Sequence, residues 1–495
     1  MASRLERISQ QRLDKLKRLR DNGTDPYPHR YQRTHTTAQT IAMLAQNEAS
    51  GKTETIKVSV AGRITAIRSM GKSAFFDLRD GSGKIQLLFQ DINKYDEDQI
   101  QLFNNLDIGD IIGVEGNLIR TKSGEPTIWV AEFTLLAKSL KPLPEKWHGL
   151  SDVETRYRQR YLDLISNPES RETFKIRSRV ITVIRHFLNE RGFLEVETPV
   201  LQPSAGGALA TPFTTHHNAL DQDFYLRIAL ELHLKRLIIG GFDKVYEIGR
   251  IFRNEGVSTQ HHPEFTMLET YEAYADYNDV MSMLEHMVYD VSRKVSDDGK
   301  AVIGEETIDF KPPWQRISLR DVIKEYSDID IVDYPTADAL HKKILSLNME
   351  TDPQRNWAKL VDELLKSSIR QRFIQPTIVF DFPIEMSPLA KSKKGEERVV
   401  ERFQAFAGGL EIANAYSELN DPIEQRQRFQ EQMKERLGSD EERWTIDEDF
   451  LMALEYGMPP TGGLGVGIDR LVMLLTNQQA IREVILFPQL REKSD

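Results

Sequence analysis

A polar hairpin in the middle of the chain concentrates residue types that bind nucleotides. The segment YEIGRIFRNEGVSTQHHPEFTMLETYEAY predicts two alternating strands around a polar loop, with Arg253 and Glu255 closing the first strand. An arginine at a strand end can fork onto a phosphate, and Phe265 can stack on a base or on the arginine itself. Glu269 and Tyr271 lie two residues apart and therefore share a strand face. The alternative is a hairpin whose charged side chains only face water. This alternative is plausible for any one of these residues, but less so for so many polar groups in one hairpin.

A second segment, GMPPTGGLGVGIDRLVMLL, places closely spaced glycines before a helix that we expect to begin near Ile468, with Arg470 in its first turn. The glycines are Gly462, Gly463, Gly465 and Gly467. Strand glycines let another group approach the backbone closely, and a helix N-terminus favours anions. The segment therefore predicts a phosphate-binding corner. A glycine-rich packing contact between strand and helix is the alternative.

These two segments belong to a long region of mixed helices and strands that starts near Tyr157 and runs to the C-terminus. A third segment, FLNERGFLEVETPVLQ, lies early in this region. It predicts a helix over 178–190 that turns at Gly192 into a strand ending at Pro199. Taken alone, this is an ordinary helix–strand unit.

The part of the chain from Ile56 to about Ala137 predicts a small β-barrel. Five apolar–polar alternating stretches are separated by glycine-rich turns. Five strands in about 80 residues fit a closed barrel, and the OB-fold is the common host of that pattern. A stiff linker, Lys141-Pro142-Leu143-Pro144, follows the barrel.

Residues 4–20 predict a basic amphipathic helix that ends before Asn22-Gly23. Its apolar residues at helical spacing are Leu5, Ile8, Leu13, Leu16 and Leu19. Two interpretations of the basic face stay open: a solvated helix surface, or a contact with an RNA backbone.

Composition limits the class of protein. A chain of 495 residues with 40% hydrophobic and 28% charged residues is globular and expected to fold as two or three domains. There are no cysteines, which excludes disulfides, thiolate zinc sites and cysteine nucleophiles. No membrane-spanning run or secretory signal is recognisable, so we expect a cytoplasmic protein. The net charge of −11 favours neither an RNA partner nor its absence.

The three segments together resemble the signature motifs of class II aminoacyl-tRNA synthetases, in their usual order. Within the aspartate, asparagine and lysine group, the resemblance is closest to the lysyl-tRNA synthetases. It rests on the strings TRYRQRYLDLI, THHNALDQDFYLRIALELHLKRLIIGGFDKVYEIGRIFRNEG, SPLAK and GGLEIANAYSELNDP. The implied fold is α+β: an N-terminal OB-fold barrel, then a catalytic domain with a central antiparallel sheet flanked by helices. The expected parts are a basic helical extension (1–55), an anticodon-binding OB-fold (56–140), a linker (141–165) and the catalytic domain (166–495).

The resemblance implies an enzyme that activates L-lysine with ATP and magnesium and transfers it to tRNA(Lys). By this pattern Arg253 holds the α-phosphate, Arg470 holds the γ-phosphate, and Glu411 holds the magnesium; these three are the expected catalytic residues. Phe265 would stack on adenine with Arg470 opposite, and the further ATP contacts would be Glu255 and His261. The resemblance also implies a homodimer, in which the first motif forms the two-fold interface.

The expected lysine pocket consists of Glu231, Glu269, Tyr271, Asn414, Tyr416 and Glu418. Glu269, Tyr271 and Glu418 would surround the side-chain ammonium, and Glu231 would meet the α-amino group. Buried ammonium groups need carboxylates or other acceptors around them. We therefore expect a pocket with three carboxylates and no cation, which suits lysine and repels aspartate.

The chain departs from the family pattern at three positions. Gln404 stands where a second metal-binding Glu is common, which puts one metal position in doubt. Gln260 and Thr211 stand where relatives often carry Arg, which predicts modestly weaker ATP binding. The pairs His216-His217 and His261-His262 lack metal-ligand spacing and predict hydrogen-bonding histidines rather than a zinc site.

Anticodon recognition would use Arg68, Phe75 and Gln86 on the barrel. Phe75 and Phe76 point to opposite faces, and we expect Phe75 to be exposed for base stacking; Phe75 in the barrel core is the alternative. Two other functions compete with a lysine ligase. A synthetase-like RNA-binding protein without catalysis is disfavoured by Arg253, Glu411 and Arg470, and an amide-forming relative such as an asparagine synthetase is disfavoured by the barrel.

Overall fold

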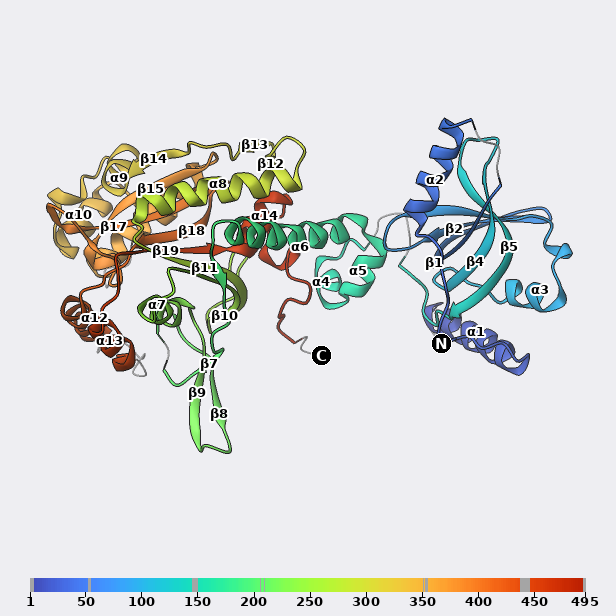
Figure 1. Ribbon diagram of the computed structural model, residues 1–495, viewed down its shortest axis with the longest axis horizontal. Coiled ribbons are helices and arrows are strands. Elements are labelled where there is room, and N and C mark those ends of the chain that lie inside the picture. Colours follow the sequence, from blue (N-terminus) through green and yellow to red (C-terminus); the bar gives the residue numbers. More distant parts are fainter. Residues whose placement is uncertain are drawn as a thin grey trace. The chain divides into compact units, whose positions relative to one another are not determined.

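The computed structural model describes residues 4–51, 55–144, 150–204, 206–208, 210–349, 351, 355–436 and 446–492. The chain divides into two compact units, Met1–Leu150 and Ser151–Asp495 (Figure 1). The division falls within the expected linker, of which residues 145–149 lie outside the described ranges. No helix in these ranges is both long and apolar enough to cross a membrane.

Unit 1 contains the expected five-stranded closed barrel, with strand order β1-β2-β3-β5-β4. Its strands are β1 (Ile56–Met70), β2 (Ser73–Arg79), β3 (Lys84–Phe89), β4 (Ile111–Arg120) and β5 (Pro126–Ala137). All neighbours are antiparallel except β3 and β5, which is the pair that closes the barrel after helix α3 (Glu97–Asn104). Phe76 lies in the apolar interior with Phe89 and Phe133, and Phe75 is half-buried.

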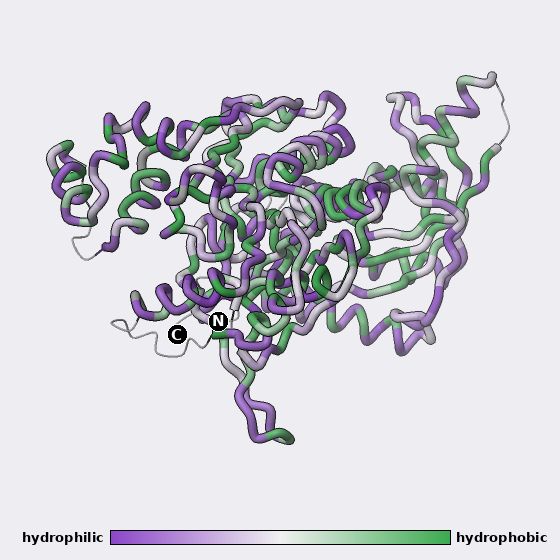
Figure 2. The backbone as a smooth tube through the Cα atoms, turned by 60° about the vertical axis from the view of Figure 1, so that its left-hand side comes forward, coloured by the Kyte–Doolittle hydropathy of each residue, from purple (hydrophilic) through white to green (hydrophobic). Residues whose placement is uncertain are grey.

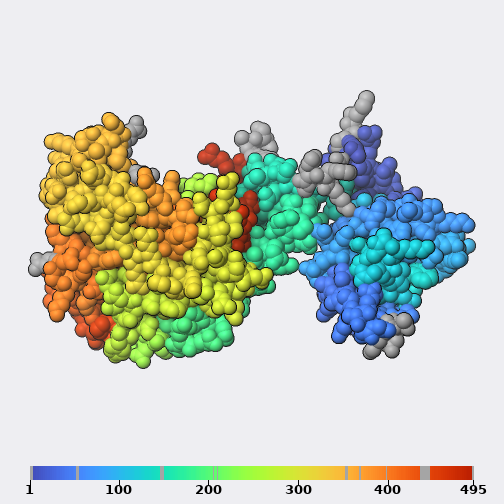
Figure 3. All heavy atoms as spheres, turned by 90° about the horizontal axis from the view of Figure 1, so that it is seen from above, coloured from blue at the N-terminus to red at the C-terminus, as the bar shows by residue number. Residues whose placement is uncertain are grey.

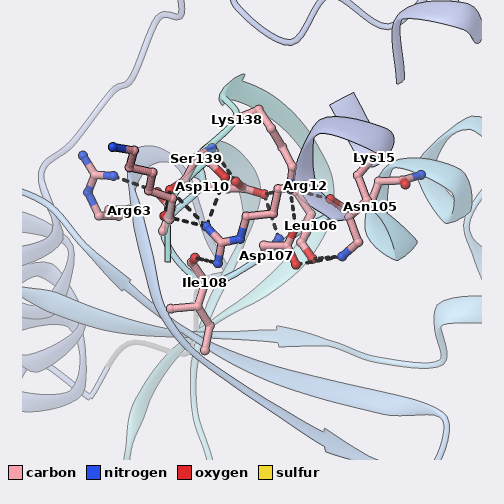
Figure 4. A network of polar contacts seen from close by, with 12 residues as sticks. Arg12, Lys15, Arg63, Asn105, Leu106, Asp107, Ile108, Asp110, Lys138 and Ser139 are labelled. Atoms are coloured by element: carbon pink, nitrogen blue, oxygen red, sulfur yellow. Dashed lines mark hydrogen bonds and ion pairs between the residues drawn. The ribbon is translucent and has the colours of Figure 1, made fainter. Parts of the chain in front are cut away.

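The N-terminal helix α1 (Arg4–Asp21) is fixed to the barrel by a buried polar network (Figure 4). Arg12 donates hydrogen bonds to the carbonyl oxygens of Ile108, Ser139 and Lys141 at 2.8, 3.0 and 2.8 Å. Beside it, the buried ammonium of Lys138 pairs with Asp110 at 2.8 Å. Of the expected apolar stripe only Leu16 and Leu19 are buried, while Leu5 and Leu13 are exposed, because a buried arginine takes part of the contact face. A second helix, α2 (Thr37–Ala49), packs on the strands.

Unit 2 is built on a sheet with strand order β14-β15-β17-β18-β19-β11-β10-β6. The strands are β6 (Leu194–Glu195), β10 (Lys244–Phe252), β11 (Glu264–Ala273), β14 (Gln315–Ser318), β15 (Thr377–Pro383), β17 (Glu396–Ala407), β18 (Leu410–Ser417) and β19 (Thr461–Gly467), with β16 (Ser392–Lys393) paired to β17. The central strands are antiparallel, as expected. The sheet is nevertheless mixed, because the outer strands β14 and β6 pair in parallel with their neighbours.

Helices α6 (Pro168–Asn189), α8 (Tyr277–Val295) and α14 (Ile468–Leu475) cover one face of this sheet. Leu268 and Val466 from the strands pack there against Val180, Leu284 and Leu471 from the helices. Further helices at the edges and on the other face are α4 (Val153–Arg158), α5 (Arg160–Ser166), α7 (Glu231–Ile239), α9 (Leu319–Ser327), α10 (Ala337–Ser346), α11 (Trp357–Leu364), α12 (Pro422–Arg436) and α13 (Glu448–Glu455). The segment from α9 to α11 forms one end of unit 2, gold in Figure 3.

Small strands complete unit 2. A sheet of β7 (Leu201–Gln202), β8 (Thr214–His217) and β9 (Gln222–Leu226) carries a mainly hydrophilic hairpin that stands out from the unit (Figure 2). A separate pair is formed by β12 (Lys300–Ile303) and β13 (Glu306–Asp309). The helix expected over 178–190 begins ten residues earlier, at Pro168, and ends at Asn189. Residues 168–173 carry no periodic apolar residues that could have indicated the earlier start. The start at Pro168 is nevertheless favourable, because proline is preferred at the first position of a helix.

Candidate active site

The floor of the candidate site is a strip of backbone without side chains. Strand β19 lies between β11 and β18, and Gly463, Gly465 and Gly467 on it face the cavity. Gly465 is the register partner of both Glu269 and Asn414, and Gly463 is the partner of Tyr271 and Tyr416. The four larger side chains therefore line the two sides of a groove that the glycines leave open.

Above this floor is a cavity of about 710 Å³, a size suited to a nucleotide together with a small second ligand. All thirteen site residues expected in the catalytic domain line it: Glu231, Arg253, Glu255, His261, Phe265, Glu269, Tyr271, Gln404, Glu411, Asn414, Tyr416, Glu418 and Arg470. They come from α7, β11, β17, β18, α14 and the connecting loops, segments that are far apart in the sequence.

The expectation of a cation-free pocket is wrong. Lys235 has a fully buried side chain and lies among the carboxylates. Its Nζ is 2.5 Å from Glu231 Oε1 and also forms an ion pair with Glu418. Burial alone would lower the pKa of Lys235, but Glu231 and Glu418 raise it above its ordinary value, so this ammonium stays charged. When Glu231, Glu269 and Glu418 are all ionised, three carboxylates and one ammonium leave two negative charges.

Glu418 has a carboxylate oxygen available for a further ligand. The ion pair with Lys235 uses Oε2, and Oε1 is buried with no hydrogen-bond partner among the described residues. The side chain fits because position 463 is glycine: a Cβ on Gly463 would lie 1.9 Å from Glu418 Oε1. Burial raises the pKa of Glu418, and the ammonium of Lys235 opposes that shift. An unpartnered, buried carboxylate oxygen is a strong acceptor for an incoming cation.

Glu269 is a buried carboxylate whose pKa is shifted toward neutrality. It accepts hydrogen bonds from the backbone N–H of Leu230 at 3.0 Å and from the Tyr271 hydroxyl at 3.0 Å. Burial, reinforced by the negative charge of Glu231, raises the pKa of Glu269 to about 7. The sequence predicted that Glu269 and Tyr271 point the same way, and their hydrogen bond confirms it.

The polar groups of β18 are oriented by neighbours. The Tyr416 hydroxyl donates to Glu231 Oε2 at 2.8 Å. Arg402 on β17 donates to Asn414 Oδ1 at 2.9 Å and is held by the Met386 carbonyl at 2.6 Å. Because an arginine only donates, the Asn414 oxygen is occupied and its NH₂ group remains to donate. Arg402 was not predicted; strand pairing places it opposite Tyr416 and beside the cavity.

The other end of the cavity is positively charged. The Arg253 guanidinium lies 5.2 Å from the centre of the Phe265 ring, and it donates to the Ile228 carbonyl at 3.3 and 3.4 Å. Arg470 donates to the backbone carbonyl of Glu411 at 2.9 Å and lies 3.3 Å from His261 Nε2. Two arginines bordering one cavity end can bind a polyphosphate between them.

Glu411 and Gln404 supply oxygen atoms at this end. A bulge in the pairing of β17 with β18 occurs next to Glu411, so that it lines the same cavity as Asn414 although the two are three residues apart. The described residues contain no group of three or more His, Asp or Glu that could hold a metal by themselves. One carboxylate and one amide oxygen do fit Mg²⁺, which usually keeps waters and substrate phosphates as its other ligands.

On the barrel, the three predicted RNA-contacting residues lie on neighbouring strands. Arg68 is the register partner of Phe75, and Gln86 is the partner of Asp77. Asp77 was not predicted; it holds the Arg68 guanidinium at 2.7 Å. The alternation that puts Phe75 and Asp77 on one strand face could have indicated it.

Comparison with known proteins gives two family matches and many relatives. Residues 152–491 match the family model of tRNA synthetases class II (D, K and N), and residues 58–143 match the OB-fold nucleic acid binding domain. The chain is 58% identical to the lysine–tRNA ligase of Dehalococcoides mccartyi strain ATCC BAA-2266, covering 99% of this chain and 98% of the relative. It is 52% identical to that of Moorella thermoacetica (98% and 98%) and 49% identical to that of Bacillus subtilis strain 168 (98% and 97%).

Proposed function

Because the chain belongs to the class II tRNA synthetases, and within them to the lysine–tRNA ligases, we propose that it activates L-lysine with ATP and transfers it to the 3′-terminal adenosine of tRNA(Lys). The observation that carries the amino-acid assignment is the buried cluster of Glu231, Glu269 and Glu418 around one internal ammonium. With all three carboxylates ionised, the two surplus negative charges match the two ammonium groups of free lysine. A pocket for aspartate would need a surplus of cations instead.

In this proposal the lysine side chain lies along the glycine floor. Its ammonium binds the free oxygen of Glu418 and the carboxylate of Glu269, with Tyr271 beside them. Its α-ammonium meets Glu231, which Tyr416 orients. The NH₂ group of Asn414 donates to the lysine carboxylate and directs it toward the positive end of the cavity.

The first reaction then needs no general base, because the lysine carboxylate is already ionised. One carboxylate oxygen attacks the α-phosphorus of ATP, and the bond to the β-phosphate oxygen breaks to release pyrophosphate. Arg253 holds the α-phosphate, Arg470 holds the γ-phosphate, and adenine stacks on Phe265, with Glu255 and His261 as further contacts. Glu411 would hold Mg²⁺, with Gln404 contributing an oxygen; the bound ion neutralises phosphate charge. In the second reaction the terminal ribose hydroxyl attacks the lysyl carbonyl carbon, and AMP leaves.

The barrel is proposed to bind the anticodon, with Phe75 stacking on a base and Arg68 and Gln86 contacting the base edges or backbone. Asp77 fixes the position of Arg68. Substitution of Phe75 by Ala should raise KM for tRNA in charging while leaving pyrophosphate exchange unchanged, because exchange does not require tRNA.

We also propose a homodimer in which the segment after α6 forms a two-fold, isologous interface. Exposed apolar side chains in this segment support the proposal: Leu194, Val200 and Leu201 are 47%, 39% and 45% exposed. Sedimentation analysis of Leu194→Asp should show a shift toward monomer. The cytoplasmic location stays a prediction from the sequence.

The decisive test of the function is amino-acid-dependent exchange of labelled pyrophosphate into ATP, run with each of the twenty amino acids. Lysine alone should support rapid exchange, and purified tRNA(Lys) should then be charged. Exchange driven by aspartate or asparagine would overturn the specificity. If Arg253→Ala left exchange unchanged, the proposed site would be wrong and a non-catalytic RNA-binding role would regain support.

A further inference from the structure

Two cations outside the three sequence motifs border the positive end of the cavity. Lys366 lies in a π-helical turn (Leu365–Ile369, η3), and Arg370 begins the next turn (Arg370–Arg372, η4). Both line the cavity together with Arg470 and His261. They reach it from the connection between α11 and β15, a segment to which the sequence assigned no function.

The two cations differ in their partners. Lys366 is paired with Asp362 at 2.6 Å, so its charge is largely balanced. Arg370 has no ion pair with a carboxylate in the described part of the chain. Its Nη2 donates to the neutral Oε1 of Gln260 at 3.2 Å, and its Nε is buried with no hydrogen-bond partner among the described residues. A half-buried guanidinium without a counter-charge is costly unless an anion completes it.

The anion that fits this position is a polyphosphate, because Arg370 lies close to the loop that also contacts Arg470. Gln260 is followed directly by His261, whose Nε2 is 3.3 Å from Arg470. Arg370 and Arg470 thus border the same stretch of the loop, one through Gln260 and the other through His261. Partial burial together with the charges of Arg470, Arg370 and Lys366 lowers the pKa of His261, which is consistent with a concentration of positive charge here.

We propose that Arg370 is a third arginine of the ATP site, which binds the β- and γ-phosphates and the departing pyrophosphate. Arg370 lies in the α11–β15 connection. Its guanidinium provides the positive charge that the neutral side chain of Gln260 lacks. This inference rests on the proposed function, since it assigns a ligand to the ATP end of the same cavity. Arg370 stabilises charge that is present in ATP and in pyrophosphate, so it acts on phosphate binding and not on lysine binding.

The test compares full-length variants in lysine-dependent pyrophosphate exchange. Arg370→Gln should raise KM for ATP and for pyrophosphate by about tenfold to a hundredfold, the effect of losing a charge-assisted contact, with KM for lysine changed less than about twofold. Arg372→Gln is the matched control: it removes the same charge from an exposed residue of the same turn, outside the cavity lining, and should leave every KM unchanged. Gln260→Arg added to Arg370→Gln should restore most of the ATP affinity.

The proposal is overturned if Arg370→Gln leaves KM for ATP unchanged. It is also overturned if KM for ATP and lysine rise together and Gln260→Arg gives no rescue, because Arg370 would then only hold the loop. Should Arg370→Gln fail to fold, Arg370→Lys keeps the charge and must retain most of the ATP affinity. Calorimetric binding of ATP to the same variants gives the answer even if the wild type shows no lysine-dependent exchange, an outcome that would contradict the proposed function instead.

Discussion

In the proposed lysine pocket, Glu269 would couple ligand binding to pH, because burial raises its pKa close to neutrality. The pKa is raised to about 7, mainly by burial, so the group is mostly protonated at pH 6 and mostly ionised at pH 8. Only the ionised form attracts an ammonium group. We expect KM for lysine to fall about tenfold between pH 6 and pH 8, while KM for ATP changes little. Glu269→Gln should raise KM for lysine and abolish this pH dependence; a wild-type KM for lysine that is flat over this range would contradict the assignment.

The same shift has a consequence for stability. A carboxyl group with a folded-state pKa above its unfolded value favours the protonated form in the native protein. The native state therefore loses stability as the pH rises from about 4.5 to about 7. At pH 8, Glu269→Gln should raise the free energy of unfolding by up to about 3 kcal/mol, measured by urea denaturation. At pH 4 the two proteins should be equally stable, and a variant less stable than the wild type at pH 8 would show that the carboxylate is favourably paired.

The buried charge of Lys235 should stabilise the fold, in contrast to that of Glu269, because it neutralises two neighbouring carboxylates. Lys235→Met would leave Glu231 and Glu418 without their counter-ion, which for a buried pair costs about 3–5 kcal/mol. We expect a large loss in the free energy of unfolding. Adding Glu418→Gln should recover part of that loss, because one of the two unpaired charges is then removed. If the single substitution is neutral, Lys235 does not form these ion pairs in solution.

At the scale of elements, strand β19 contributes to the site through missing side chains. A Cβ on Gly463 would overlap Glu418 Oε1 and come within 2.8 Å of the Tyr271 ring. Gly463→Ala should therefore displace Glu418, raise KM for lysine about tenfold or more and lower the melting temperature, since forced overpacking costs about 1–3 kcal/mol. Gly465→Ala is the matched comparison, because its nearest neighbour would be 3.6 Å away. Equal losses of thermal stability in the two variants would contradict the mechanism.

Helices and strands with a regular apolar–polar pattern could be predicted from the sequence. Side-chain contacts between residues on different strands could not. Period-two alternation placed Glu269 with Tyr271, and the run of short strands indicated the barrel. Lys235 was missed although it lies four residues after Glu231 on a helix, a spacing that puts both on one face. The position of Glu411 depends on a bulge, and Arg402 meets Asn414 only through strand pairing. These contacts depend on how strands distant in the sequence are aligned in the sheet. A local sequence pattern does not contain that alignment.

On the scale of the whole molecule, the two units have separate hydrophobic cores and divide the proposed work. Every expected ATP- and lysine-binding residue lies in Ser151–Asp495, and the expected anticodon residues lie in Met1–Leu150. A protein of residues 151–495 should therefore retain lysine-dependent pyrophosphate exchange within a few fold of the full chain but charge tRNA poorly. Failure of exchange in a folded fragment would show that unit 1 contributes to activation.

The internal ammonium also reduces the negative charge that the pocket offers to small cations. Small monovalent cations such as potassium are abundant in cells, and three bare carboxylates would concentrate them. Lys235 already pairs with one oxygen of Glu231 and one of Glu418, so the net charge offered to such an ion is smaller than three carboxylates alone would give. An amino acid with two amino groups at the correct separation can satisfy both residual charges at once. We therefore expect Lys235, a side chain of the same kind as the ligand, to weaken the competition of small cations with that ligand.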